Sequence, residues 1–244
     1  MKTPPVEQVA KMDAETFFNR LAMLMQDNPP AAEDAEMLLK LASIGIIPGE
    51  PFSLEGRPPV YVETLEHALK TAQRKISSTP RVSWQWENHW WLAPVLGDYG
   101  TNYDERAAIA MYGLGANLAE DAIYPMAQED GQGKKLNGHN RYIIHFPKDA
   151  IPPVNAFWSL TLYDEDQLFV ENELKRYAIG DRDDLHYNAD GSLDIYIQHE
   201  SPKGELASNW LPSPEENFSV FLRLYWPKDE VLRGDWLAPA IYSY

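Results

Sequence analysis

Residues 155–164 read NAFWSLTLYD, and the alternation in this stretch decides the fold expected for the second half of the chain. Successive side chains of a β-strand point to opposite faces of the sheet. One face therefore carries the apolar side chains of Ala156, Trp158, Leu160 and Leu162. The other face carries the aromatic and hydroxyl side chains of Phe157, Ser159, Thr161 and Tyr163. The pattern predicts a strand that covers a core on one side and presents a mixed face on the other.

Residues 218–226 repeat this arrangement. Their predicted core face carries Phe218, Val220, Leu222, Leu224 and Trp226. Their opposite face carries Ser219, Phe221, Arg223 and Tyr225. If the two strands lie in one sheet, one surface holds the predicted ligand-binding residues Ser159, Thr161, Tyr163, Phe221, Arg223 and Tyr225. Arg141 and His145, on a further predicted strand at residues 140–147, are expected to join this surface.

The mixed face has two interpretations. Aromatic rings, hydroxyls and one planar cation together suit a small polar organic molecule, a carboxylate or a saccharide. Buried polar groups also commonly exist to satisfy one another. In this second interpretation the face packs on a helical domain, and Arg223 pairs with one of the chain's many carboxylates.

Composition excludes several classes of function. The 244 residues carry a formal net charge of -16, which argues against nucleic-acid or anionic-membrane partners. Cysteine is absent, which excludes disulfides and zinc–thiolate sites. No apolar run approaches the ~20 residues of a membrane span, and the first residues lack a signal-peptide core. The chain as written is therefore expected to be cytoplasmic, and periplasmic or secreted if a native signal precedes it.

Apolar spacing changes along the chain from a helical to an alternating period. The spacing predicts helices from Asp13 to Asn28, from Asp34 to Gly45, from Val62 to Ser77 and from Tyr103 to Asn117. Strands are predicted at residues 140–147, 155–164, 194–198 and 218–226. The change of period near residues 120–138 is the expected domain boundary.

Residues 84–91 read WQWENHWW and separate the third and fourth predicted helices. Tryptophan buries a large apolar area, so an interdomain plug is one interpretation of the segment. The alternative is an aromatic platform for sugar or aromatic rings.

An ordered series of motifs runs through the second half. It comprises Tyr124, Asp130-Gly131, Leu136-Asn137-Gly138, Tyr142, residues 152–163, Arg176-Tyr177, Asp190-Gly191-Ser192-Leu193, residues 209–212, Arg223-Leu224-Tyr225 and Pro227. This series, with residues 97–101 and Arg106 upstream, resembles the bacterial family known as domain of unknown function 1214. In that family the domain commonly follows a partner, domain of unknown function 1254.

The resemblance implies an α+β protein with a helical domain at residues 1–120. An antiparallel jelly-roll-like β-sandwich is then expected at residues 121–244. The family supplies no agreed activity, and it implies an N-terminal partner domain.

Chemistry is only weakly indicated. The weak acid–base candidates are Asp98, Tyr124 and His145. Ser159 could use His145 as its base, but no G-x-S-x-G elbow surrounds this serine. The histidines at 139, 145, 186 and 199 show no local metal-binding spacing, so neither a metal nor a cofactor is predicted. Asp130-Gly131 and Asp190-Gly191 are better explained as turns.

Three functional hypotheses follow. The first is a module that binds a small polar molecule or saccharide on the mixed face. The second is a hydrolase or lyase acting on such a ligand. The third is an assembly domain that docks an N-terminal partner domain or a second copy of the chain.

Overall fold

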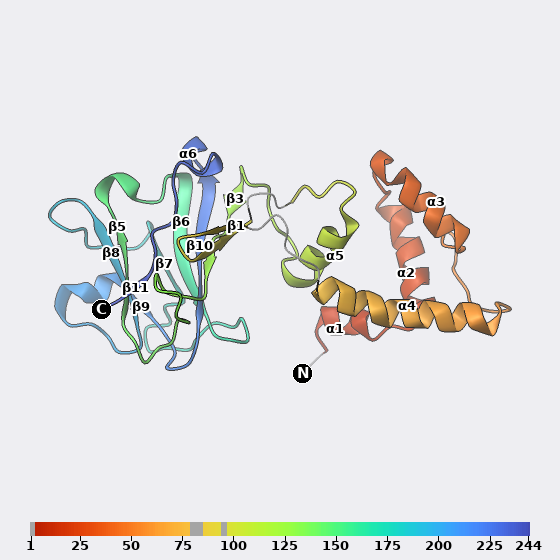
Figure 1. The fold of residues 1–244 in the computed structure, drawn as a ribbon, viewed down its shortest axis with the longest axis horizontal. Helices are drawn as coiled ribbons and strands as arrows, with labels where there is room; N and C mark the ends of the chain where they lie inside the picture. The colour runs from red at the N-terminus through yellow and green to blue at the C-terminus, as the bar shows by residue number, and fades with distance from the viewer. Residues whose placement is uncertain (1–2, 79–84, 94–96) are drawn as a thin grey trace. The chain divides into compact units, whose positions relative to one another are not determined.

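The computed structural model describes residues 3–78, 85–93 and 97–244, and the chain divides into two compact units (Figure 1). The helical unit comprises Met1–Arg81 and Tyr99–Ala116, and the sheet unit comprises Val82–Asp98 and Asn117–Tyr244. Helices and antiparallel sheets together make this an α+β protein, as predicted. None of the described helices is both long and apolar enough to cross a membrane.

The helical unit contains five α-helices and one 3-10 helix among its described residues. They are α1 Pro5–Ala10, α2 Ala14–Asp27, η1 Ala32–Asp34, α3 Ala35–Ser43, α4 Pro59–Ser77 and α5 Tyr103–Tyr112. Asp13 caps α2 as predicted, because its carboxylate accepts a 2.7 Å hydrogen bond from the amide of Thr16. The predicted fourth helix is too long, because α5 ends at Tyr112 and Gly113 follows as its C-cap. The first helix, α1, was not predicted.

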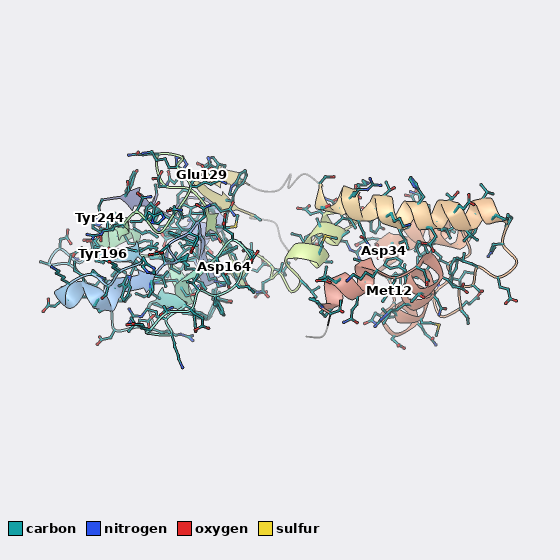
Figure 2. All side chains as sticks on the ribbon, turned by 90° about the horizontal axis from the view of Figure 1, so that it is seen from below. Met12, Asp34, Glu129, Asp164, Tyr196 and Tyr244 are labelled. Carbon is teal, nitrogen blue, oxygen red and sulfur yellow. The ribbon has the colours of Figure 1, made fainter. Side chains whose placement is uncertain are left out.

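The helical unit has a small core and one buried carboxylate. The buried apolar residues of this core are Ala14, Ala22, Ile46, Phe52 and Leu65. Asp34, labelled in Figure 2, is only 8% exposed. Its Oδ1 accepts hydrogen bonds from the Tyr103 hydroxyl at 2.8 Å and from Nη1 of Arg106 at 3.3 Å. These contacts attach α5 to the start of α3.

Two sheets form the second unit (Figure 1). The larger is ordered β1 Gln85–Glu87, β2 Trp90–Leu92, β4 Met126–Ala127, β10 Ser219–Pro227, β6 Val154–Tyr163 and β7 Ala178–Gly180, with β3 Ala122–Ile123 also paired to β10. The smaller is ordered β11 Tyr242–Ser243, β5 Tyr142–Phe146, β8 Leu193–Gln198 and β9 Trp210–Pro212. All pairings are antiparallel except β8 with β9, which is parallel. Short helices lie at η2 Lys148–Ala150, η3 Gly204–Asn209 and α6 Asp229–Leu232.

Both sheets contribute to one hydrophobic core. Trp158, Leu160 and Leu222 from β6 and β10 belong to the same buried cluster as Ile144 of β5 and Ile195 of β8. The alternation predicted for residues 155–164 and 218–226 is therefore confirmed over most of both strands. The division at residue 120 stays a prediction, and the sheet unit also takes in the hairpin β1–β2 upstream of it.

Trp226 corrects the predicted core face of β10. The pairing of β10 with β6 shifts between Tyr225 and Pro227, and Trp226 adopts φ 50° at this bulge. A bulge inserts an extra residue and interrupts the alternation of side chains. The side chain of Trp226 is 62% exposed instead of buried.

Replacement of Leu222 tests the shared core. Leu222→Ala should lower the free energy of unfolding of the sheet unit by about 2–5 kcal/mol, because it leaves a cavity at a site with 0% exposure. The matched control Leu168→Ala, at a side chain that is 62% exposed, should change it by less than about 0.5 kcal/mol. Chemical denaturation followed by tryptophan fluorescence measures both, and equal losses would contradict the assignment of the core.

The contact of Tyr103 with Asp34 predicts a pH dependence of the helical unit. The Tyr103 hydrogen bond lowers the pKa of Asp34 below its usual 3.8, against the opposing effect of burial. A lowered folded-state pKa contributes stability that is present above the unfolded pKa and is lost as pH falls through the folded pKa. The helical unit should therefore lose stability below about pH 4.

Tyr103→Phe should make the helical unit less stable at neutral pH and should reduce its further loss on acidification. The control Tyr61→Phe removes a hydroxyl that donates to the carbonyl of Ile44, so it should lower stability equally at all pH values. Circular dichroism at 222 nm follows the helices. The same acid dependence in Tyr103→Phe and the wild type would refute the role of this contact.

Candidate functional site

The mixed face is formed by the pairing of β6 with β10. Ser159 lies opposite Arg223, Thr161 opposite Phe221, and Phe157 opposite Tyr225. Directly paired residues of an antiparallel sheet project from the same face. The pairing therefore brings the predicted residues of the two strands onto one surface.

The pairing also extends this face to the hairpin β1–β2. Trp86 pairs with Trp91, Trp91 with Met126, and Met126 with Phe221. These four residues form one row across the sheet. Trp86 and Trp91 are 39% and 38% exposed, and their ring centroids lie 4.6 Å apart. The sequence shows the tryptophans, but the registers that place them in the same row as Phe221 join segments far apart in the chain.

The other side of the hairpin belongs to the core. Trp90 is 3% exposed, and its indole N–H donates a 2.8 Å hydrogen bond to the carbonyl of Pro239. The hairpin therefore combines both interpretations, because its side chains alternate between two faces. Trp90 is buried in the core, and Trp86 and Trp91 are exposed on the mixed face. Trp84 lies outside the described residues.

Arg223 is the principal charged group of the mixed face. Its Nη2 donates a 2.8 Å hydrogen bond to the hydroxyl of Tyr163. Its guanidinium carbon lies 5.6 Å from the ring centroid of Tyr163 and 5.7 Å from that of Phe221, within the range of cation–π attraction. Its Nη1 is buried and has no hydrogen-bond partner among the described residues. No ion pair joins Arg223 to a carboxylate in the described part of the chain, so the expected structural ion pair is not found there.

Arg223, Ser159 and Gly180 pair across three neighbouring strands and form the Arg223 row. Aromatic rings stack on both sides of this row. On one side the rings of Phe157 and Tyr225 stack at 4.4 Å, with the Arg182 guanidinium 3.9 Å from the Phe157 centroid. On the other side Phe169 stacks with Tyr163 at 5.2 Å and with Tyr177 at 5.1 Å. Stacked rings restrict one another's rotation, so the surroundings of Arg223 are ordered before any ligand arrives.

The residues paired in the Arg223 row are small. Gly180 pairs with Ser159, and a Cβ atom at Gly180 would lie 2.2 Å from the carbonyl oxygen of Trp158. Only glycine fits this position without movement of the backbone. Ser159 is half-buried, whereas Thr161 is 5% exposed and its hydroxyl is not accessible to a ligand without rearrangement.

His145 does not join the mixed face, contrary to expectation, and neither does Arg141. His145 lies on β5 of the smaller sheet, where its neighbours Ile144 and Phe146 point into the core. It therefore projects from the outer face of that sheet, while Ser159 projects from the outer face of the larger one. The Ser159–His145 pair is thus excluded by the core between them. Nδ1 of His145 instead lies 2.6 Å from Oδ1 of Asp194.

Tyr124 lies beside the mixed face. The ring of Tyr124 lies 5.9 Å from that of Tyr225, and its hydroxyl accepts a hydrogen bond from the Asn117 amide. Burial raises the pKa of Tyr124, with Asn117 opposing and Tyr225 adding to the effect. A raised pKa keeps the phenol protonated, which suits a hydrogen-bond donor and not a general base. Asp98 is exposed.

The remaining chemical motifs have structural explanations. Oδ1 of Asp130 accepts the amides of Gln132 and Lys134 at 2.9 and 3.0 Å, which closes a turn. The Asn209 side chain accepts a hydrogen bond from the backbone N–H of His186 and donates one to the His186 carbonyl. Among the described residues no three His, Asp or Glu side chains gather as a metal site.

The two central strands of the mixed face lie in a region that matches a known protein family. Residues 121–229 match the family described as Protein of unknown function (DUF1214). The resemblance is thereby confirmed for this DUF1214 region, which includes β6 and β10 and excludes the hairpin that bears Trp86 and Trp91. No curated protein matches the chain.

Solved structures that match the chain include one from Vibrio parahaemolyticus and one from Burkholderia cenocepacia. The VPA0106 protein from Vibrio parahaemolyticus has a TM-score of 0.69 at 23% identity, and the match covers 100% of this chain and 58% of that protein. This likeness extends the shared fold beyond the DUF1214 region, and this chain spans little more than half the length of the Vibrio protein. An uncharacterized protein from Burkholderia cenocepacia has a TM-score of 0.35 at 12% identity, covering 87% of this chain and 49% of that one.

Substitution of arginines tests whether Arg223 supports the fold. Arg223→Met should change the free energy of unfolding by less than about 1 kcal/mol, because methionine keeps much of the apolar stem and only one hydrogen bond is lost. Arg176 is the matched control, since its Nη1 donates to the carbonyls of Ala207 at 3.0 Å and Trp210 at 2.8 Å. Arg176→Met should cost about 2 kcal/mol or more in denaturant unfolding. An equal cost for Arg223→Met would assign Arg223 to structure.

Proposed function

We propose that the protein binds a small organic molecule through a carboxylate, with Arg223 as the anchoring group. The observation that carries the proposal is the buried, unpartnered Nη1 of Arg223. The chain has 37 acidic residues, and none of those described pairs with this guanidinium. A cation left without an anion in so acidic a protein is expected where the anion is a ligand.

The chemistry of the guanidinium favours a carboxylate. A buried charged donor without a partner is unfavourable, and a ligand oxygen that reaches Nη1 after local rearrangement of the side chains covering it removes this penalty. Nη1 and Nη2 form one edge of the planar fork, and Nη2 keeps a second N–H besides the one donated to Tyr163. A carboxylate matches such an edge with two parallel hydrogen bonds.

The aromatic rings around Arg223 favour a ligand whose body, apart from the carboxylate, is an apolar ring. Tyr225 and Phe221 offer apolar ring surface near Arg223, whereas the faces of Phe157 are covered by Tyr225 and by the Arg182 guanidinium. Trp86 and Trp91 lie farther along the sheet on the same face. A ligand with an aromatic or alicyclic body next to its carboxylate gains apolar burial as well as the ionic contact.

The hydrolase or lyase hypothesis has less support. Acid–base catalysis requires a group within hydrogen-bond reach of the substrate. His145 lies on the other sheet and Tyr124 has a raised pKa, so neither supplies a base beside Arg223 at neutral pH. Binding alone is therefore the proposal.

Two further proposals concern the sandwich architecture and a partner domain. Two sheets with one common core support a jelly-roll-like sandwich as the ligand-binding scaffold. For assembly, we propose that this chain docks a partner domain of the family known as domain of unknown function 1254. The greater length of the Vibrio protein is in keeping with this proposal.

Calorimetric titration with benzoate tests the proposal. Benzoate should bind, and the neutral isostere benzamide should bind at least about tenfold more weakly, because it lacks the charge that Arg223 needs. Arg223→Met should abolish benzoate binding. Arg141→Met, which removes an exposed arginine next to the other sheet, should leave it unchanged. Equal binding of benzamide, or benzoate binding that survives in Arg223→Met, would exclude the proposed site.

A further inference from the structure

A cavity of about 160 Å³ lies at the far end of the mixed face from Arg223. Ser219, which lines it, lies opposite Tyr163 and projects from the mixed face, four residues along β10 from Arg223. Four strand residues span about 13 Å along the backbone. The Arg223 side chain reaches Tyr163, which lies opposite Ser219, but neither Arg223 nor Tyr163 lines the cavity. Asp164, labelled in Figure 2, is one of the residues that line it.

The walls of this cavity are polar and its base is apolar. Its polar lining residues are Gln128, Lys135, Asp164, Glu165, Gln167, Asn217 and Ser219. Leu136 and Phe218, which are 0% and 4% exposed, complete the lining. Two carboxylates and one ammonium leave an excess of negative charge, so the cavity repels the anions that Arg223 attracts.

Hydrogen bonds hold the polar walls in place. Oδ1 of Asp164 accepts the amides of Asp166 at 3.0 Å and Leu168 at 2.8 Å. Oε1 of Glu165 accepts the Asn217 amide at 2.9 Å. These bonds occupy one oxygen of each carboxylate, and no hydrogen bond reaches the second oxygen from the described residues. Acceptors that hydrogen bonds hold in place and that remain open to solvent are suited to the hydroxyl donors of a ligand.

The amide of Gln167 extends this set. Its Nε2 donates a 3.3 Å hydrogen bond to the hydroxyl of Ser219, which is 2% exposed. That bond leaves the amide oxygen of Gln167 as a further acceptor. The cavity volume is similar to the ~150 Å³ of a cavity that holds benzene, so a six-membered ring fits.

We propose that this cavity binds a neutral polyol of monosaccharide size. Its hydroxyls donate to Asp164, Glu165 and Gln167, and its C–H face lies against the small exposed part of Phe218. The excess negative charge disfavours acids, and the apolar base favours a ring over a small hydrated cation. This second site does not depend on the carboxylate site at Arg223.

Gln167 offers a variant that separates binding from folding. Its backbone has φ 61°, a conformation that glycine adopts without strain. Gln167→Gly should therefore retain the fold while removing the amide from the cavity. Lys175→Gly is the matched control, because Lys175 is exposed, has φ 50° and does not line the cavity.

The test is titration of ¹⁵N-labelled protein with D-glucose and with myo-inositol. At least one polyol should shift the amide signals of Gln167, Asn217 and Ser219 saturably. The dissociation constant should rise about tenfold in Gln167→Gly and stay unchanged in Lys175→Gly. Shifts should persist in Arg223→Met, which separates this proposal from the carboxylate site.

Three results would overturn the polyol site. One is the absence of shifts with both polyols. Another is saturable binding of methylammonium at these amides in their place, which would make the cavity a cation site. The third is equal affinity of Gln167→Gly and Lys175→Gly for the polyol.

Discussion

The antiparallel pairing of β6 with β10 is the constraint on which the sheet unit depends. Its register places Leu160 opposite Leu222 and Ser159 opposite Arg223. Because side chains alternate with period two, a slip of one residue would turn Arg223 into the core and Leu222 to the outside. Burial of the core face therefore specifies the mixed face as well. The mixed face and the stability of the fold come from one and the same register.

This coupling explains how a polar surface is kept ordered. Arg223 projects from a strand whose alternate residues are fully buried, so its backbone is held by the core. The stacked rings of Phe157 and Tyr225, and of Tyr163 and Phe169, then restrict the side chains around it. The two proposed sites differ in charge, since one offers a guanidinium and the other an excess of carboxylates. We propose on this basis that one sheet face discriminates between an acid and a neutral polyol.

Local patterns predicted the long elements well, for reasons that lie in short-range physics. The cap at Asp13 and the alternation in residues 155–164 depend on interactions within a few residues, and both are confirmed. Strands of two or three residues, such as β3, β4 and β7, are too short for any period to be read. The bulge at Trp226 and the early end of α5 likewise depend on single backbone conformations. The cavity at Ser219 left no signal in the sequence, because residues 128–136, 164–167 and 217–219 form it jointly.

The sequence by itself determined which side chains of each long strand share a face, because that follows from the geometry of one strand. It also determined that the second half is rich in strands and that its polar face holds Ser159, Tyr163, Arg223 and Tyr225. Only the tertiary structure decided which strands are neighbours. It placed His145 on the other sheet, Trp91 on the same face as Phe221, and no carboxylate of the described residues beside Arg223. Strand pairing joins residues far apart in the chain, and its energy comes from the burial of a common core, which no single segment records.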